Sequence, residues 1–138
     1  MHRISGRCHC GNVTIEVTLT EDSESYRPRA CDCEFCHKHA AAYISDPDGS
    51  LVIHVMEPKL IAHYRQGSGA AEMLLCGRCG VLIGALYEEA GQRLGVVNVR
   101  VLETTAFGLP ETVSPKALTA SAKIERWQRL WFRDVRDA

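Results

Sequence analysis

The sequence has no long apolar segment and no excess of charge of one sign. Its longest apolar runs, such as residues 81–87, are far shorter than the roughly 20 residues of a membrane-spanning helix. Sixteen basic and 17 acidic residues leave a net charge of −1, and neither sign gathers in a tail. Residues 1–7 also lack the apolar stretch of a signal peptide. We therefore expect no membrane protein, no signal for export, and no binding to nucleic acid by bulk charge.

Internal repeats, low-complexity segments and linkers are missing as well. The chain has 138 residues, of which 46% are hydrophobic, and this is enough for one well-filled core. We therefore expect residues 1–138 to form a single domain.

Alternating apolar and polar residues predict a mainly β structure. Between residues 12 and 20 the apolar side chains occupy every second position, which is typical of a half-buried strand. Residues 21–29 are predicted to form a loop, and residues 40–45 fit either a short strand or the end of a helix. Turn-forming residues stand at 46–49 and 67–69. Further strands are predicted at 51–55, 60–64, 81–87 and 93–102.

Residues from about 114 to 136 are predicted to form a C-terminal amphipathic helix. Ser114 and Pro115 suit the first turn of a helix. The apolar residues at helical spacing are Ile124, Trp127, Trp131 and Val135. We expect the two tryptophans to pack on the sheet, and a role at an interface or in ligand binding is the alternative.

All seven cysteines lie in three short groups. An odd number leaves one thiol over in a disulfide framework, and a chain of this length can build a core without crosslinks. We therefore expect thiols held by metal in a reducing compartment, the cytoplasm. A thioredoxin-like site does not fit, because the groups do not open a helix in a βαβ unit. An iron–sulfur cluster is possible, but the Cys-x-Cys spacing in a mainly β chain favours zinc. The groups are Cys8 and Cys10; Cys31, Cys33 and Cys36; and Cys76 and Cys79.

Seven thiols divide most simply into four and three. A structural zinc takes four ligands in a tetrahedron, whereas a catalytic zinc keeps one position open. Two closed all-thiolate sites would need eight cysteines. We therefore predict one closed site made of two pairs and one open site made of Cys31, Cys33 and Cys36, which are already neighbours. Spacing alone does not determine which pairs share an ion.

The cysteine groups resemble those of the glutathione-dependent formaldehyde-activating enzyme family, also called the CENP-V/GFA domain. The matching segments are residues 6–13, 31–36 and 76–80, and the resemblance extends from about residue 6 to residue 102. It implies an Mss4-like fold of antiparallel strands with two zinc ions. It also implies a structural zinc and a catalytic, more labile zinc. The implied ligands are Cys8, Cys10, Cys76 and Cys79 for the structural ion, and Cys31, Cys33 and Cys36 for the catalytic ion.

The reaction implied by the resemblance adds glutathione to formaldehyde, and its reverse breaks a carbon–sulfur bond. An open zinc position suits this chemistry, because the metal would hold the incoming thiol as a thiolate. We therefore expect a carbon–sulfur lyase-like enzyme that handles adducts of glutathione or another small thiol with formaldehyde or a related aldehyde. The alternatives are a non-catalytic zinc-stabilised binding module of the same fold and, less favoured because the chain has no basic extension, a nucleic-acid binder.

Two histidines follow the cysteine triple directly. His37 or His39 could transfer protons or supply a fourth zinc ligand, with His37 slightly favoured, and a solvent-facing position is the alternative. Lys38, Arg65 and Arg78 could contact the carboxylates of a glutathione-like ligand, although such cations are more often simply solvated.

Overall fold

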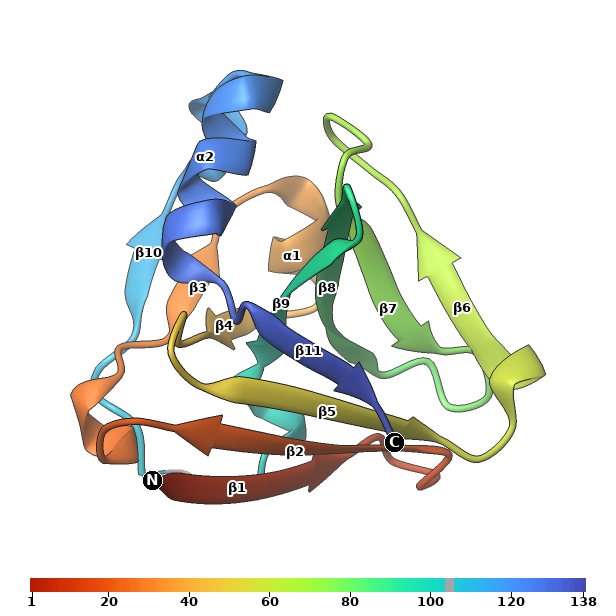
Figure 1. Ribbon diagram of the computed structural model, residues 1–138. Helices are drawn as coiled ribbons and strands as arrows, with labels where there is room; N and C mark the ends of the chain where they lie inside the picture. The colour runs from red at the N-terminus through yellow and green to blue at the C-terminus, as the bar shows by residue number, and fades with distance from the viewer. Residues whose placement is uncertain (104–105) are drawn as a thin grey trace.

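Two β-sheets form the body of the computed structural model, which describes residues 1–103 and 106–138 (Figure 1). Most strand pairs are antiparallel, but β11 runs parallel to β5 and β10 runs parallel to β3. The predicted mainly β fold of antiparallel strands is confirmed. The smaller sheet contains, in order, β1 (His2–Arg7), β2 (Val13–Leu19), β5 (Ser50–Val55) and β11 (Asp134–Asp137). The larger sheet contains, in order, β10 (Glu111–Val113), β3 (Arg29–Cys31), β4 (Ala42–Ile44), β9 (Gln92–Asn98), β8 (Leu82–Glu89), β7 (Glu72–Cys76) and β6 (Ile61–Tyr64).

Two α-helices accompany the sheets. The short α1 (Glu34–Lys38) follows β3, and α2 (Ala120–Leu130) lies near the C-terminus. No helix in the described part of the chain is long and apolar enough to cross a membrane. Single 3-10 turns occupy Ser23–Ser25, Pro58–Leu60, Val99–Val101 and Pro115–Ala117.

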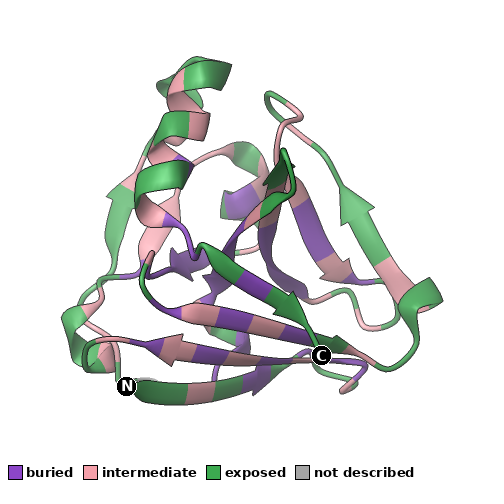
Figure 2. Cartoon of the chain, in the orientation of Figure 1, coloured by how far each residue is buried: buried purple, intermediate pink, exposed green. Residues whose placement is uncertain are grey.

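The larger sheet has a hydrophobic core on each of its faces. One core, which includes Val17 and Leu51 of the smaller sheet and Val97 of β9, lies between the two sheets. The other lies between the larger sheet and α2, and both Trp127 and Trp131 belong to it, as predicted. Strands β8 and β9 are therefore buried along much of their length (Figure 2). A strand covered on both faces shows an apolar run rather than an alternation, which explains residues 81–87.

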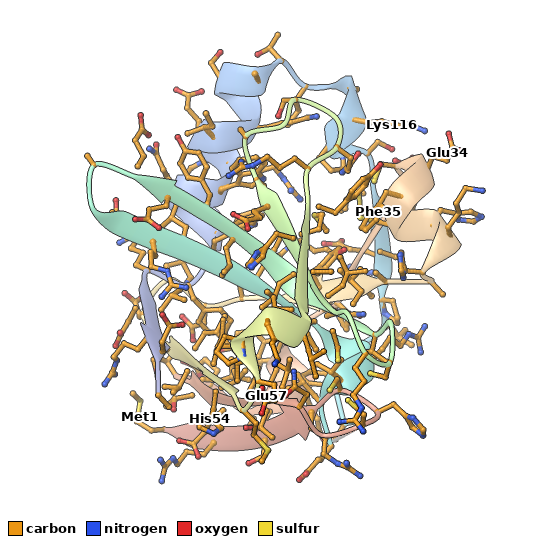
Figure 3. The ribbon with its side chains drawn as sticks, turned by 90° about the vertical axis from the view of Figure 1, so that its right-hand side faces the viewer. Met1, Glu34, Phe35, His54, Glu57 and Lys116 are labelled. Carbon is orange, nitrogen blue, oxygen red and sulfur yellow. The ribbon has the colours of Figure 1, made fainter. Side chains whose placement is uncertain are left out.

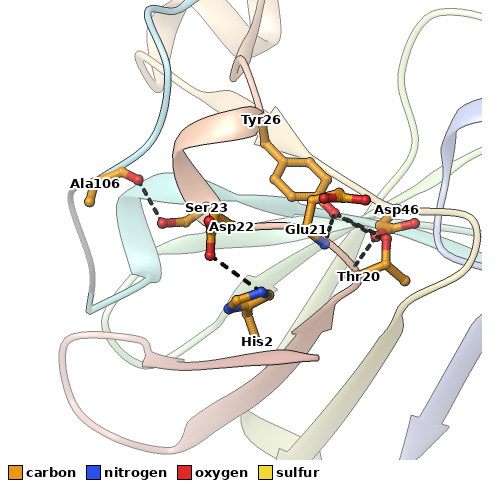
Figure 4. A network of polar contacts seen from close by, with 8 residues as sticks. All are labelled: His2, Thr20, Glu21, Asp22, Ser23, Tyr26, Asp46 and Ala106. Atoms are coloured by element: carbon orange, nitrogen blue, oxygen red, sulfur yellow. Dashed lines mark hydrogen bonds and ion pairs between the residues drawn. The ribbon is translucent and has the colours of Figure 1, made fainter.

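A buried carboxylate anchors the predicted turn at residues 46–49. Oδ2 of Asp46 accepts hydrogen bonds from the Thr20 N–H at 2.9 Å and from the hydroxyls of Thr20 and Tyr26 at 2.6 Å each (Figure 4). Its Oδ1 accepts the Asp48 N–H at 2.9 Å. Burial alone would raise the pKa of Asp46, but these hydrogen bonds to the ionised form outweigh it and lower the pKa. The carboxylate thus ties the end of β2 to the turn before β5.

The C-terminal helix begins later than residue 114. Thr119 caps α2, because its hydroxyl accepts a hydrogen bond from the Ala122 N–H at 3.2 Å. Ser114 and Pro115 instead open a separate 3-10 turn. The predicted start was wrong because the sequence offers two capping residues, and the second begins the helix.

The helix also ends earlier than residue 136. Gly95 and Phe132 exchange two backbone hydrogen bonds, of 3.0 and 2.9 Å, which draw the chain back to the sheet after Leu130. Val135 therefore lies on β11, where it pairs with Leu51. Its helical spacing from the tryptophans was misleading, because the buried Phe132 side chain and the free edge of β5 favour a strand.

The predicted strand at residues 93–102 stops at Asn98. Oδ1 of Asn98 accepts the Arg100 N–H at 3.2 Å and so caps the turn Val99–Val101. Its Nδ2 donates to the Leu82 carbonyl oxygen at 3.0 Å. The alternation beyond residue 98 was misread as a strand because a buried asparagine with these partners ends the ladder instead of facing solvent.

Candidate metal centres and the adjoining cavity

The first cysteine cluster joins two knuckles that lie at strand ends. The Cys10 sulfur lies 3.7 Å from the Cys8 sulfur and 3.6 Å from the Cys76 sulfur. Cys79 completes a set of four sulfurs that all lie within 4.8 Å of one another. Zinc–sulfur bonds of about 2.3 Å in a tetrahedron place sulfurs about 3.8 Å apart. These cysteines are free thiols. The spacing therefore suits one tetrahedral cation and does not suit disulfides.

A glycine with left-handed backbone follows each knuckle. Gly11 has φ of 84° and Gly80 has φ of 81°, a region that glycine enters without steric cost. In the second knuckle the Cys76 sulfur accepts the Cys79 N–H at 3.5 Å. Backbone N–H groups that point at sulfur favour the thiolate, the form that binds metals.

The thiols of this cluster have pKa values that move in opposite directions. Desolvation raises the pKa of Cys79, but backbone N–H groups and neighbouring thiols outweigh it and lower the pKa to about 6. The Asn12 N–H lowers the pKa of Cys10, but desolvation and neighbouring thiols raise it to about 11. Four acids this close cannot ionise together without a counter-charge. A divalent cation would allow all four to ionise.

The second cluster is built locally, from the end of β3 and the first turn of α1. Cys33 caps α1, and its sulfur accepts the Cys36 N–H at 3.4 Å. The sulfurs of Cys31, Cys33 and Cys36 lie within 4.8 Å of one another, and no fourth His, Cys, Asp or Glu of the described residues joins them. Hydrogen bonding from Cys36 lowers the pKa of Cys31 to about 6 against its desolvation, and the same contact raises the pKa of Cys36.

Two polar side chains hold the sulfurs of the second cluster. The Tyr43 hydroxyl lies 3.1 Å from the Cys36 sulfur, and Nε2 of Gln66 donates to the Cys33 sulfur at 4.0 Å. Burial and the nearby thiolates raise the pKa of Tyr43, so this hydroxyl stays protonated and can donate to an ionised Cys36.

A cavity of about 230 Å³ adjoins the second cluster, and all three of its cysteines line the cavity. The indole rings of Trp127 and Trp131 stack at 4.8 Å and form part of the wall. The vertex that the three thiols leave unused can therefore be reached by a small molecule in a largely apolar space. Further lining residues are Met73, Ala85 and Val96 of the larger sheet and Gln66, Gly67 and Ser68 of the β6–β7 loop.

Four cationic side chains also line this cavity: Arg29, Lys116, Lys123 and Arg126. Burial, with a smaller effect from the charge of Arg126, lowers the pKa of Arg29 to about 10, so Arg29 remains charged at neutral pH. Lys116, at the rim, pairs with Asp32 at 3.7 Å. Figure 3 shows Lys116 at the same end of the molecule as Glu34 and Phe35.

Residues 3–122 match the family model described as glutathione-dependent formaldehyde-activating enzyme. This chain belongs to that family, abbreviated GFA. A crystal structure of a Rhodobacter sphaeroides protein is similar, with 23% sequence identity and a TM-score of 0.50 over 97% of this chain and 99% of that chain. At this identity the likeness concerns the fold alone. A search of curated proteins gives no match.

The GFA match contains all seven cysteines but ends one residue before Lys123. The wall of the cavity formed by Lys123, Arg126, Trp127 and Trp131 therefore lies outside the matched residues. The sequence favoured packing on the sheet for the two tryptophans, with ligand binding as the alternative, and it indicated no role for Lys123 or Arg126 at the site. A signal was present, because helical spacing places Lys123, Trp127 and Trp131 on one face.

Other residues considered from the sequence do not reach the second cluster. His37 is exposed, His39 contacts the Phe35 ring at 4.8 Å, and neither lines the cavity or joins the cysteines. Lys38 and Arg65 also lie outside the cavity lining, as does Arg78. The structure thus brings together the seven predicted cysteines in groups of four and three. The cations that line the cavity are Arg29, on the same strand as Cys31, and Lys116, Lys123 and Arg126 from the C-terminal segment.

Proposed function

We propose that this chain is a zinc-dependent, carbon–sulfur lyase-like enzyme that handles adducts of a small thiol, such as glutathione, with formaldehyde or a related aldehyde. The observation that carries the proposal is the difference in ligand number between the two clusters. Four thiols lie together at a spacing that suits one tetrahedral ion, whereas the other three line a cavity. All-thiolate donor sets of this kind favour zinc. Cys8, Cys10, Cys76 and Cys79 would hold the structural ion; Cys31, Cys33 and Cys36 would hold the catalytic, more labile ion.

The reaction joins the thiol sulfur to the carbonyl carbon. A carbon–sulfur bond forms while the thiol proton ends on the former carbonyl oxygen, and the reverse reaction breaks that bond and returns the proton to sulfur. Zinc bound by the three thiolates would supply a positive charge that favours the substrate sulfur as a thiolate. Free thiols in all seven positions suit a reducing compartment such as the cytoplasm.

The contribution of the protein side chains is to position the reacting groups and to exclude water. Tyr43 fixes the Cys36 sulfur and Gln66 contacts the Cys33 sulfur, so the three ligands keep one geometry. The apolar wall around Trp127 limits water near the reacting carbon, which strengthens electrostatic interactions inside the cavity.

The alternative function is a non-catalytic, zinc-stabilised binding module of the same fold. It is favoured by the cavity lining, which among the described residues includes no histidine and no carboxylate that could transfer a proton. The two functions make different predictions for turnover, although both predict metal binding.

The test combines metal content, ligand exchange and turnover. We expect two zinc ions per chain in the wild type and one in Cys33→Ser, with the far-UV circular dichroism unchanged. In cobalt-substituted wild type, glutathione should shift the thiolate-to-cobalt charge-transfer bands. Exchange between formaldehyde and its glutathione adduct, followed by NMR, should be accelerated by the wild type and not by Cys33→Ser.

The exposed His37→Asn variant serves as the control and should behave as the wild type. Acceleration that survives in Cys33→Ser would overturn the enzymatic proposal. If no small thiol changes the cobalt bands, the proposal that the metal at the three-cysteine cluster has a free coordination position would be wrong.

A further inference from the structure

Three of the cations that line the cavity have no ionic partner. Arg29, Lys123 and Arg126 form no ion pair within the described residues, whereas the fourth cation, Lys116, is paired with Asp32. Arg29 is partly anchored by donating a hydrogen bond to the Ser45 hydroxyl at 2.7 Å. Partly buried cations without a counter-ion are costly, because they lose hydration without gaining a partner. Their presence in one cavity therefore indicates that an anion is the intended occupant.

The acidic residue that influences both Arg29 and Arg126 does not fill this role. Glu111 exerts an electrostatic effect on both Arg29 and Arg126, and the Cys31 thiolate exerts a larger one on Arg126 alone. Glu111 is paired with Arg27 at 3.3 Å, however, and it does not line the cavity. The guanidinium groups of Arg29 and Arg126, which line the cavity, can therefore bind an anionic ligand.

The cations and the three thiols share one small space. The volume of about 230 Å³ is comparable with that of a cavity that holds one small organic molecule. A ligand that places its sulfur at the cysteines and its anionic group at the guanidiniums must therefore have the two groups only a few bonds apart. Glutathione carries its carboxylates at the two ends of a tripeptide, so these would remain outside the cavity.

Two segments of the chain meet at the rim of the cavity. A Cβ atom placed on Gly67 would lie 3.5 Å from the Lys123 ammonium, and the neighbouring Gln66 donates a hydrogen bond to the Cys33 sulfur. The C-terminal segment thus approaches the β6–β7 loop beside the cysteine triple. Lys123 and Arg126 lie beyond residues 3–122, which match the GFA family model, whereas Arg29 lies within them.

We propose that the cavity selects a short thiol carboxylate, or its aldehyde adduct, by pairing the carboxylate with Arg126, Arg29 and Lys123. Guanidinium groups suit this role because they bind carboxylates through two parallel hydrogen bonds. The identity of the reacting sulfur rests on the proposed function, whereas the carboxylate contact does not.

The test uses two thiols of similar length and different charge. 3-Mercaptopropionate should bind the cobalt-substituted protein at least about tenfold more tightly than the neutral 2-mercaptoethanol, as expected for one charge-assisted hydrogen-bonded contact. In Arg126→Gln this preference should fall below about threefold, and Arg126→Lys should restore part of it. Arg129→Gln is the matched control, since Arg129 is an exposed residue of the same helix that does not line the cavity.

A second readout needs neither thiol nor cobalt. The only two tryptophans of the sequence both line the cavity, so their fluorescence reports its occupant. Propionate added to the zinc-loaded protein should change this fluorescence in the wild type and in Arg129→Gln but not in Arg126→Gln. If Arg126→Gln does not fold, as judged by circular dichroism, Lys123→Gln takes its place in both assays.

The outcomes separate this inference from the proposed function. Equal affinity for the two thiols, unchanged in Arg126→Gln, would overturn the inference and leave the thiol-binding site intact. If no thiol shifts the cobalt bands but propionate still changes the fluorescence, the proposed function fails and the carboxylate site stands. Glutathione that outcompetes 3-mercaptopropionate and loses as much affinity in Arg126→Gln would overturn the limit to short ligands.

Discussion

The two cysteine clusters differ in how far apart along the chain their ligands lie. The four-cysteine cluster joins the knuckle after β1 to the knuckle between β7 and β8, and 66 positions separate Cys10 from Cys76. These knuckles belong to different sheets. Cys8 and Cys76 are fully buried in the core between those sheets. The three-cysteine cluster spans residues 31–36 alone and borders the cavity.

This difference in sequence separation suggests different roles for the two clusters, one in stability and one in ligand binding. A cation that links distant segments closes a long loop and so removes much conformational freedom from the unfolded chain. A cation bound within six consecutive residues closes almost no loop, and its site can be left incomplete with little effect on the fold. The long-range cluster can therefore stabilise the protein while the local cluster remains open to a ligand.

Loss of a ligand from the four-cysteine cluster should have the largest effect. Structural zinc contributes about 10–16 kcal/mol to small zinc domains, and whole domains are stable by only about 5–15 kcal/mol. We expect Cys76→Ser to be largely unfolded at 25 °C and to lose the closed-site metal. Circular dichroism and metal analysis of the purified protein measure both effects.

The matched variant is Cys33→Ser in the three-cysteine cluster. Its free energy of unfolding should fall by no more than about 2 kcal/mol, because the loss is confined to one short turn. Equal destabilisation by Cys76→Ser and Cys33→Ser would break the comparison, since both clusters would then support the fold.

A second prediction concerns the reactivity of the two clusters after mild chelation of the labile metal. The pKa of Cys31 is lowered from 9.0 to about 6, so its thiolate predominates above that pH and is lost as the pH falls through it. Iodoacetamide at pH 7 should label Cys31 before Cys36, whose pKa is raised and whose side chain is buried. Peptide mass spectrometry over pH 5–9 should give a labelling rate for Cys31 with a midpoint near pH 6.

The protection of the closed site is the internal control for this labelling. Cys79 also has a pKa lowered to about 6, but a retained metal ion should keep it unlabelled. Labelling of Cys79 as fast as Cys31 would show that both ions leave together. A midpoint for Cys31 near 9 would contradict the hydrogen bonding that lowers its pKa.

The parts of this structure that the sequence predicts are those set by local pattern. The alternation at 13–19 identifies β2, and the grouping of three cysteines within residues 31–36 identifies the three-cysteine cluster, because both signals lie within short segments. The joining of the other two pairs was implied only by the family resemblance, because Cys10 and Cys76 lie 66 positions apart. By contrast, β1 exposes most of its residues and buries only Gly6, so its strand character comes from pairing with β2. Strands β10 and β11 are likewise set by their partners.

The cavity could not be predicted for the same reason. Its unpaired cations come from β3 and from α2, more than 80 residues later, and nothing local signals that Arg29 and Arg126 line one cavity. The histidines beside the cysteine triple carried the stronger local signal, yet the short helix turns His37 to solvent. Tertiary packing determines which charges reach the thiols, and only the structure contains that information.

The last prediction concerns Asp46, in a turn that lies away from both cysteine clusters. Asp46→Asn keeps the shape of the side chain but weakens its hydrogen bonds with Thr20 and Tyr26, so we expect a loss of about 1–3 kcal/mol at pH 7 with both metal ions retained. Asp48→Asn, at an exposed position in the same turn, should cost less than about 0.5 kcal/mol. Urea unfolding with metal analysis measures both.

The pH dependence of this loss has a definite sign. The pKa of Asp46 is lower in the folded state than the ordinary value of about 3.9, so its stabilisation is fully present above that value and disappears as the pH falls through the folded pKa. The difference between wild type and Asp46→Asn should therefore narrow below about pH 4. Both proteins lose thiolate-bound metal on acidification, so their difference isolates the carboxylate. Loss of metal from Asp46→Asn at pH 7 would instead show that the Asp46 turn and the cysteine clusters stabilise each other. That outcome would contradict the assignment of separate roles to the two metal sites.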